Sequence, residues 1–264
     1  MNHKERLKAA YNAGEFREKG HALVDMIGDY LEQIYQGGEE PVLPDKQPGE
    51  LLAKYREMLA RHPHELSDLF ASVIGDSNHL HHPGYMGHQV CAPLPVTALS
   101  SLLGSLLNNG SAIYEMGMSN VAMEKVVIDF TAEKMGMPPS ADGVMTSGGS
   151  LGNLTALLAA RQQKTGYDTW NEGIRNEDPP VFLVPEQAHY SIAKAIRIMG
   201  HGDGGVVTVP CDDRFKMITA KIPGIISEVE KSQRRVIGIA ASAGSTATGA
   251  YDPLEEVAAI CREK

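Results

Sequence analysis

Small residues at positions 146–150 separate two apolar stretches of the chain. The run Thr-Ser-Gly-Gly-Ser follows a short apolar stretch, and a helical pattern through Leu151, Leu154 and Leu157 begins directly after it. Such a loop offers unpaired backbone N–H groups at the positive end of a helix dipole, and its adjacent glycines let an anion approach closely. The chemistry that these residues could perform is phosphate binding. A tight turn with a helix cap is the alternative interpretation.

Two further polar segments each follow a short apolar run. Residues 185–191 (Pro-Glu-Gln-Ala-His-Tyr-Ser) come after the apolar residues 181–184, and residues 242–249 come after residues 236–241. Ligand sites of parallel sheets form just beyond the carboxyl ends of the strands. The three segments together could supply a phosphate cradle, an aromatic nitrogen base at His189 and a group of small hydroxyls.

Alternating strands and helices are predicted to position these segments. The expected strands are residues 181–184, 206–209 and 236–241, and the helices that follow them are residues 191–199, 219–231 and 253–262. This alternation indicates an α/β fold with a mostly parallel sheet covered on both faces. Before it, helical patterns cover residues 16–35, 49–62, 63–74, 97–108 and 121–135, with a proline-rich connector at 41–48 and an ordered loop at 79–95.

Composition limits the classes of protein to which the chain could belong. The 264 residues are 42% hydrophobic and 22% charged, with a formal net charge of −9. The negative charge argues against a general binder of nucleic acid or of anionic membranes. No apolar run approaches the roughly 18–20 residues of a membrane span, and the charged N-terminus is unlike a signal peptide. Three scattered cysteines fit no disulfide framework, so we expect a cytoplasmic protein.

Four segments of the chain, taken together, resemble a known enzyme family. They are residues 146–161 (Thr-Ser-Gly-Gly-Ser-Leu-Gly-Asn and onward), 188–195 (Ala-His-Tyr-Ser-Ile-Ala-Lys-Ala), 243–253 (Ala-Gly-Ser-Thr-Ala-Thr-Gly-Ala-Tyr-Asp-Pro) and 82–88 (His-Pro-Gly-Tyr-Met-Gly-His). The chain resembles the group II pyridoxal-phosphate-dependent amino-acid decarboxylases, of the aromatic-amino-acid and glutamate type. The resemblance implies a fold-type-I transferase-like architecture. It divides the chain into a helical N-terminal arm with a substrate-side loop (residues 1–95) and the N-terminal portion of the large cofactor-binding domain (residues 96–264).

The resemblance also implies roles for individual residues. The cofactor would be pyridoxal 5′-phosphate, and its phosphate would be held by Gly148, Gly149 and Ser150. His189 would stack on the pyridine ring as the catalytic residue, close to the substrate carboxylate, and Thr246 would touch the cofactor from the third strand end. The residues expected on the substrate side are Tyr85, His88 and Gln89.

The expected reaction is α-decarboxylation of an L-amino acid to the amine. The family needs an Asp beside the pyridine nitrogen and a Schiff-base Lys, and the resemblance places both beyond Lys264. A β-α series that stops after a helix also lacks its next strand, so we expect a further C-terminal portion. Lys194, Lys221 and Lys231 fall in predicted helices, where a solvated face is expected. The chain on its own would therefore be inactive. The missing portion would come from the continuation of this chain or from a second polypeptide. The resemblance also implies that the whole protein is a homodimer.

Several alternatives are open at this point. A pyridoxal-phosphate carbon–carbon lyase of the sphingosine-phosphate-lyase type shares much of this framework, and a non-catalytic half acting as an assembly partner is a second possibility. The cluster His79, His81, His82 and His88 lacks carboxylate or cysteine partners and helical i, i+4 spacing, so we expect no metal. The glycines at 202–205 precede a strand instead of following one, which indicates a turn and not a dinucleotide site.

Overall fold

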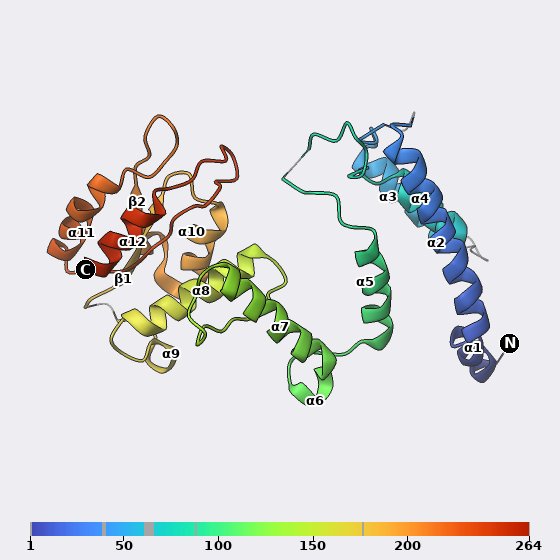
Figure 1. The fold of residues 1–264 in the computed structure, drawn as a ribbon, viewed down its shortest axis with the longest axis horizontal. Helices are drawn as coiled ribbons and strands as arrows, with labels where there is room; N and C mark the ends of the chain where they lie inside the picture. The colour runs from blue at the N-terminus through green and yellow to red at the C-terminus, as the bar shows by residue number, and fades with distance from the viewer. Residues whose placement is uncertain (1, 39–40, 61–65, 88, 176, 264) are drawn as a thin grey trace. The chain divides into compact units, whose positions relative to one another are not determined.

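The computed structural model describes residues 2–38, 41–60, 66–87, 89–175 and 177–263. The chain divides into two compact units, residues 1–106 (unit 1) and residues 107–264 (unit 2). Unit 1 is built from helices, and unit 2 combines helices with a parallel β-sheet (Figure 1). Among the described residues, no helix has the length and apolar character needed to cross a membrane.

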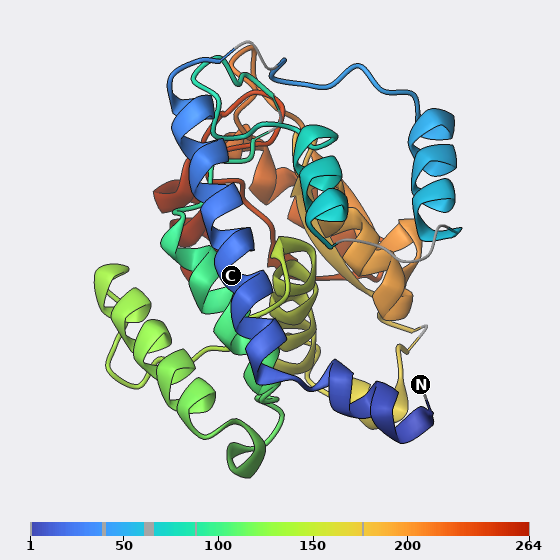
Figure 2. The same ribbon diagram turned by 90° about the vertical axis from the view of Figure 1, so that its right-hand side faces the viewer.

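Helix caps set the limits of the long helix of unit 1. α2 (Ala13–Tyr35), the long blue helix of Figure 2, begins before the expected residue 16, because the Asn12 side chain accepts hydrogen bonds from the backbone N–H groups of Gly14 and Glu15. It ends before Gly37, whose positive φ of 68° favours glycine. The other helices of this unit are α1 (His3–Ala10), α3 (Pro48–Ala60), α4 (Leu66–Gly75) and α5 (Val96–Leu107).

Unit 1 is held together by a few specific contacts. α2 packs against α4, and Ile34 of α2 is buried. Asp76, just after α4, accepts a hydrogen bond from Lys54 Nζ at 2.6 Å and another from the Tyr55 hydroxyl at 3.0 Å, both on α3. The bond from Lys54 lowers the pKa of Asp76. The helix expected over residues 63–74 is α4, and residues 63–65 lie outside the described residues.

Unit 2 alternates strands and helices as the sequence predicts. Its helices are α6 (Tyr114–Gly117), α7 (Ser119–Lys134), α8 (Gly149–Lys164), α9 (Thr169–Glu172), α10 (Tyr190–Ile196), α11 (Ile222–Lys231) and α12 (Leu254–Glu263). Its strands are β1 (Pro180–Pro185), β2 (Val206–Val209) and β3 (Arg235–Ile239). The strands form one parallel sheet in the order β2-β1-β3, with Phe182 opposite Val206 on one side and Gly238 on the other.

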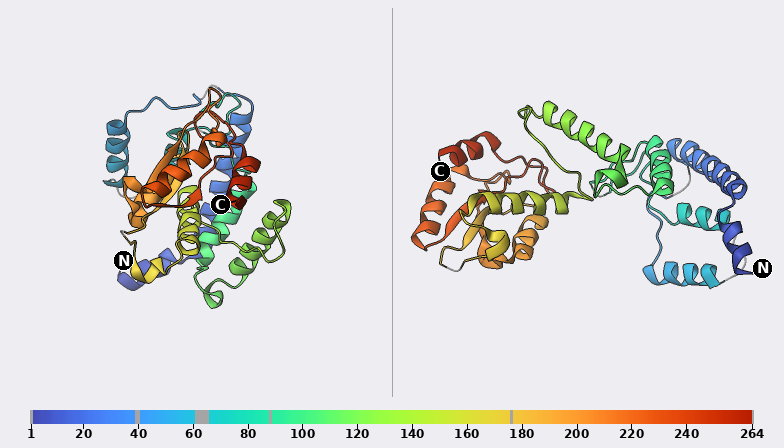
Figure 3. Two further views of the ribbon diagram at one scale, coloured as in Figure 1. Left: turned by 90° about the vertical axis from the view of Figure 1, so that its left-hand side faces the viewer. Right: turned by 90° about the horizontal axis from the view of Figure 1, so that it is seen from below.

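The central strand β1 separates two hydrophobic cores. Phe182 and Val184 face one core with residues of α8 and α10, and Leu183 faces the other core with residues of α11 and α12. This alternation follows from the two-residue period of a strand, and it explains why β1 is apolar throughout. Figure 1 shows α10 and α8 on one side of the strands and α11 and α12 on the other, and Figure 3 shows α8 lying along the sheet. The α/β class predicted from the sequence is confirmed.

Some expected elements of unit 2 differ at their ends. The helix expected over residues 191–199 is α10 followed by a π-helical turn (Arg197–His201), because Gly200 has a φ of 91° that breaks the α-helical path. The helix expected from residue 219 opens with a 3-10 turn (Thr219–Lys221) before α11. β3 ends at Ile239 instead of residue 241, although the Ala240 N–H still donates to the Leu183 carbonyl at 2.9 Å.

Candidate functional site

A cavity of about 220 Å³ lies in unit 2, beyond the carboxyl ends of β1 and β3. It brings together His189 from the segment after β1, Thr246 from the segment after β3 and Asn153 from α8. The remaining lining residues are Ile192 and residues 240–245. Two of the three predicted segments therefore meet at this cavity, at the edge of the sheet where ligand sites of parallel folds form.

The third predicted segment, residues 146–150, forms the start of α8. The helix begins at Gly149 with Gly148 as its N-cap, and no side chain caps it. The Thr146 hydroxyl donates to the Gly148 carbonyl at 3.1 Å, which closes the turn without using the first N–H groups of the helix. Apart from the adjacent residues and the backbone of the helix itself, no heavy atom of the described residues lies within 4 Å of a Cβ placed on Gly148 or Gly149, so the space over this backbone is open. Open, uncapped N–H groups at the positive end of a helix suit an anion.

The loop that leads to α8 is fastened to α7. The Glu124 carboxylate accepts a hydrogen bond from the Met145 N–H at 2.8 Å. Asp142 accepts from the Gly143 N–H at 2.9 Å and pairs with Lys125 at 3.2 Å. These two donors, the Gly143 N–H first, lower the pKa of Asp142. The exposed residues Gly148, Gly149 and Ser150 therefore begin α8 from a held loop, although none of them lines the cavity itself.

His189 is held at the start of α10 by two polar groups of Ser191. Its Nδ1 accepts a hydrogen bond from the Ser191 N–H at 3.3 Å, so that it caps the helix. The same Nδ1 lies 2.7 Å from the Ser191 Oγ. Asn153 of α8 donates from Nδ2 to that Oγ at 2.9 Å. The imidazole is half-buried, and its orientation is tied to α8 through a buried hydroxyl.

The segment after β3 is a loop closed by a buried carboxylate. Asp252, 6% exposed, accepts from the Ser242 N–H and from the Met217 N–H, both at 2.7 Å. The backbone of Ala243 pairs with that of Tyr251, and the Ser245 and Thr248 hydroxyls lie 2.5 Å apart. Gly244 has a φ of 90°, which a side chain would strain. This closure fixes the stretch that presents Thr246 to the cavity.

The expected substrate-side residues belong to unit 1. The Tyr85 N–H donates to the His82 carbonyl at 2.9 Å, and Tyr85 is half-buried in its own unit. Gln89 is exposed, and His88 lies outside the described residues. The role of these three residues at the substrate pocket stays a prediction.

The histidines near residue 80 have structural partners in unit 1. His79 is buried, and its Nδ1 lies 3.0 Å from the Tyr30 hydroxyl. His81 packs edge-on against Tyr35, and His82 Nδ1 accepts from the Gly84 N–H at 2.9 Å. Within the part of the chain that the structure describes, no group of three or more potential ligands could hold a metal ion.

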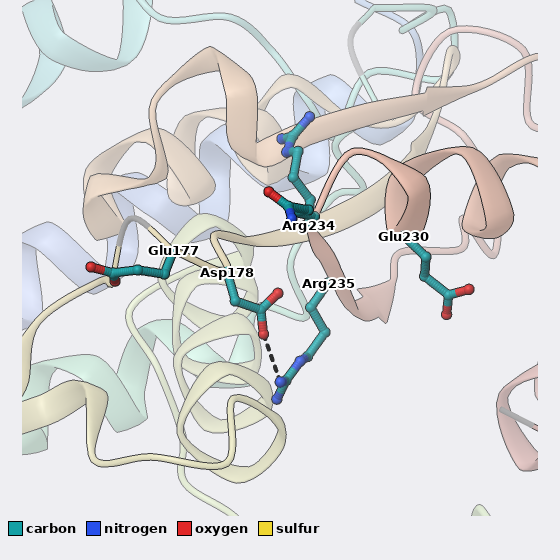
Figure 4. A pocket seen from close by; sticks show the side chains of 6 residues that line it. Glu177, Asp178, Glu230, Arg234 and Arg235 are labelled. Carbon is teal, nitrogen blue, oxygen red and sulfur yellow. Dashed lines mark ion pairs between the residues drawn. The ribbon is translucent and has the colours of Figure 1, made fainter.

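A second pocket of about 630 Å³ lies where β1 and β3 begin, at the other end of the sheet from the cavity. Glu177, Asp178, Glu230 and Arg234 line it, and Asp178 pairs with Arg235 at 2.6 Å (Figure 4). Its ionic groups are solvated, and none is arranged around a buried nucleophile or base. Volume alone therefore does not identify a site, and the smaller cavity, which His189 and Thr246 line, is the candidate site.

The residues that hold the site are not those that the sequence singled out. Asn153, Ser191 and Asp252 all fall inside the segments quoted above, yet their types carried no separate signal. The sequence indicated the roles of Ser191 and Asp252 through their positions next to expected helix starts. Ser191 stands two residues after His189, where a helix cap bonds, and Asp252 precedes a proline at the start of a helix.

A family model matches most of the chain. The model describes the pyridoxal-dependent decarboxylase conserved domain and matches residues 61–264. The aromatic-L-amino-acid decarboxylase of Bacillus atrophaeus is 25% identical over 257 residues, which are 96% of this chain and 51% of that protein. A glutamate decarboxylase-like protein of Gibberella zeae is 29% identical over 216 residues, 79% of this chain and 41% of that protein.

A solved structure shares the fold. The crystal structure of mouse CSAD superposes with a TM-score of 0.81 at 27% identity, covering 93% of this chain and 53% of that chain. The chain thus spans about half the length of the relatives it matches.

Proposed function

Because the chain belongs to the family of pyridoxal-dependent decarboxylases, we propose that the whole protein decarboxylates an L-amino acid to its amine with pyridoxal 5′-phosphate as cofactor. The family resemblance that the sequence predicted is confirmed. In this proposal the chain supplies the phosphate cradle and the imidazole that stacks on the cofactor ring. The observation that carries the proposal is the cavity shared by His189, Thr246 and Asn153, with Asn153 on the same helix that begins at Gly149.

The residues present suit this cofactor. A phosphate monoester needs several N–H donors without competing side chains, and the start of α8 has no side-chain cap and open space over two glycines. An aromatic cofactor ring can stack on a planar side chain, and the half-buried His189 imidazole lines the cavity. The carboxyl ends of β1 and β3 bound the same cavity, so one ligand could reach the imidazole and the loop after β3.

The protein's part in the reaction is to orient groups and to handle a proton. Bound pyridoxal phosphate supplies an electron sink for the pair of electrons left behind when carbon dioxide departs. The N–H groups at the start of α8 would hold the phosphate and so anchor one end of the cofactor. His189 stacks on that ring, and its Nε2 is free to approach the substrate carboxylate and to serve in proton transfer. Thr246 positions the cofactor from the loop after β3.

The covalent anchor is proposed to come from another part of the whole protein or from a second polypeptide. No lysine lines the cavity among the residues that the structure describes, and Lys194, Lys221 and Lys231 are exposed. We therefore expect this chain alone to be inactive.

The test is cofactor retention and amine formation by the whole protein. Wild-type protein is expected to show the absorbance of bound pyridoxal phosphate, and to release carbon dioxide from an L-amino acid in a panel of acidic, aromatic and basic substrates. Gly149→Val places a branched side chain over the phosphate donors, so we expect cofactor retention to fall at least about tenfold. Gly224→Val on α11 is the matched control, because Gly224 also has open space around it and lies away from the cavity.

Two outcomes of this test would favour the alternatives. Release of an aldehyde without carbon dioxide from a phosphorylated long-chain β-hydroxy amine added to the panel would favour a carbon–carbon lyase of the sphingosine-phosphate-lyase type. Failure of the whole protein to retain pyridoxal phosphate would favour a non-catalytic assembly partner.

The remaining proposals concern assembly and location. We propose a homodimer, which the exposed leucines of α5 support. A cytoplasmic location is proposed from the composition, and cell fractionation would test it.

A further inference from the structure

We propose that Ser191, linked to Asn153, is a positioning residue that keeps the proton of the neutral His189 ring on Nε2. The geometry that leads to this proposal is a chain of three side chains from two helices. Asn153 Nδ2 lies 2.9 Å from Ser191 Oγ, and Ser191 Oγ lies 2.7 Å from His189 Nδ1. Ser191 is 2% exposed, so water does not readily replace either partner.

The direction of each hydrogen bond fixes the tautomer. The backbone N–H of Ser191 can only donate, and it points to His189 Nδ1 at 3.3 Å. The Asn153 amide donates to Ser191 Oγ, which leaves the hydroxyl hydrogen for Nδ1. Nδ1 therefore accepts twice and carries no proton, and the proton of the neutral imidazole must be on Nε2.

A cap on α10 would not need this whole arrangement. The Ser191 N–H bond alone already makes His189 the side-chain cap of the helix. The hydroxyl and the Asn153 amide add a link from α8, and both Asn153 and His189 line the cavity. Among the described residues, Nε2 has no hydrogen-bond partner, so it is the ring nitrogen available to a ligand. This last step rests on the proposed function: the Nε2–H group would then face the substrate carboxylate as a hydrogen-bond donor.

The test reads the tautomer directly and needs no substrate. Protein with ¹⁵N-labelled histidine is measured by long-range ¹H–¹⁵N correlation at about pH 8.5, where an ordinary imidazole is neutral. The signals of His189 are identified by their loss in His189→Gln. In the wild type, Nε2 is expected to be pyrrole-type and Nδ1 pyridine-type.

Asn153→Asp should invert the tautomer. A carboxylate has no hydrogen to donate, so it would accept the Ser191 hydroxyl hydrogen, and the freed Oγ lone pair would accept from Nδ1–H. This contact, 2.7 Å long in the wild type, would then prevail over the longer bond from the Ser191 backbone N–H at 3.3 Å, which would lose Nδ1 as its acceptor. We expect the Nε2 signal to move from the pyrrole-type to the pyridine-type position. An unchanged spectrum in a folded Asn153→Asp protein would overturn the proposal.

Ser191→Ala supplies the control and a second test. In the double variant with Asn153→Asp, the bridging hydroxyl is absent and the inversion should disappear. An inversion that persists would contradict the relay, by which we mean the hydrogen-bonded series Asn153, Ser191 and His189. Ser191→Ala alone leaves the backbone N–H at 3.3 Å as the remaining donor to Nδ1, so the share of the Nε2–H tautomer should fall, and Ser191→Thr should restore the wild-type signals. If Ser191→Ala keeps the full wild-type tautomer, the Ser191 hydroxyl has no positioning role and the proposal is overturned.

Kinetics of the whole protein separate the relay from the proposed reaction. If the proposed relay and the proposed decarboxylation are both correct, Asn153→Asp should lower kcat at least about tenfold while KM changes little. The reason is that a catalytic histidine in the wrong tautomer loses turnover. The predicted tautomers without any decarboxylation would count against the proposed function and leave the relay standing.

Discussion

At the scale of single residues, buried polar atoms in unit 2 set the protonation of two histidines in different ways. His189 accepts at Nδ1 from Ser191. His201, at the end of the π-helical turn, has its Nδ1 3.0 Å from the Pro180 carbonyl, which can only accept, so Nδ1 carries the proton there. Its Nε2 is buried and has no partner among the described residues. A second proton on this ring would therefore have no acceptor.

The burial of His201 predicts a pH dependence of stability. Burial lowers the pKa of His201 below its ordinary value, and the nearby Arg161 charge lowers it further, against the bond to Pro180. The unfolded chain then binds more protons than the folded one once the pH drops below the unfolded pKa of about 6.5. The free energy of unfolding should thus be fully retained above that pH and fall as the pH decreases toward the folded pKa.

Urea unfolding at about pH 7.5 and about pH 5.5 measures this effect. His201→Gln should unfold more easily at the higher pH but lose less stability on acidification than the wild type. His21→Gln, at an exposed position of α2, should keep the wild-type pH dependence. An equal loss in wild type and His201→Gln would remove His201 from the explanation.

At the scale of elements, the strands were predictable and the contacts between distant segments were not. Continuous apolar runs bounded by polar turns predicted β1 and β2 closely, and β1 is apolar throughout because a central parallel strand is buried on both faces. The uncapped start of α8 followed from its glycines. The bond between Asn153 and Ser191 joins residues 38 apart, and it depends on how α8 packs on α10, which no local pattern encodes. The π-helical turn likewise depends on the conformation of Gly200.

The loop after β3 is an element whose shape depends on one carboxylate. Asp252 accepts two backbone N–H groups, and both would lose their acceptor in Asp252→Ala. A buried donor without a partner costs roughly 1–3 kcal/mol, so we expect the variant to lose about 3 kcal/mol of unfolding free energy. Under the proposed function it should also weaken cofactor retention, since the loop carries Thr246.

Urea unfolding of Asp252→Ala and of Asp213→Ala checks this expectation. Asp213 is exposed, and its replacement should change stability by less than about 0.5 kcal/mol. Equal, small effects of the two substitutions would show that the loop is held by other contacts.

At the scale of the whole molecule, α5 carries an apolar stripe that faces solvent. Leu99, Leu102, Leu103 and Leu106 follow helical spacing and are 45–64% exposed. The positions between them include serines and a glycine, so the apolar residues gather on one side of the helix. A stripe of this kind is a common sign of a protein–protein interface. It supports the proposed association of two copies of the chain.

Charge placed in this stripe should disrupt self-association. Leu103→Glu combined with Leu106→Glu would bring two carboxylates into the interface, where they would lose hydration without a partner. We expect at least a tenfold weaker dimer, on the order of 1.4 kcal/mol or more, measured by sedimentation equilibrium over a range of protein concentrations. The control combines Leu7→Glu with Leu43→Glu, which adds the same charge at exposed leucines of unit 1 outside α5 and should leave the dimer intact. A wild-type protein that stays monomeric at tens of micromolar, or a stripe variant as dimeric as the control, would mean that α5 does not join two copies.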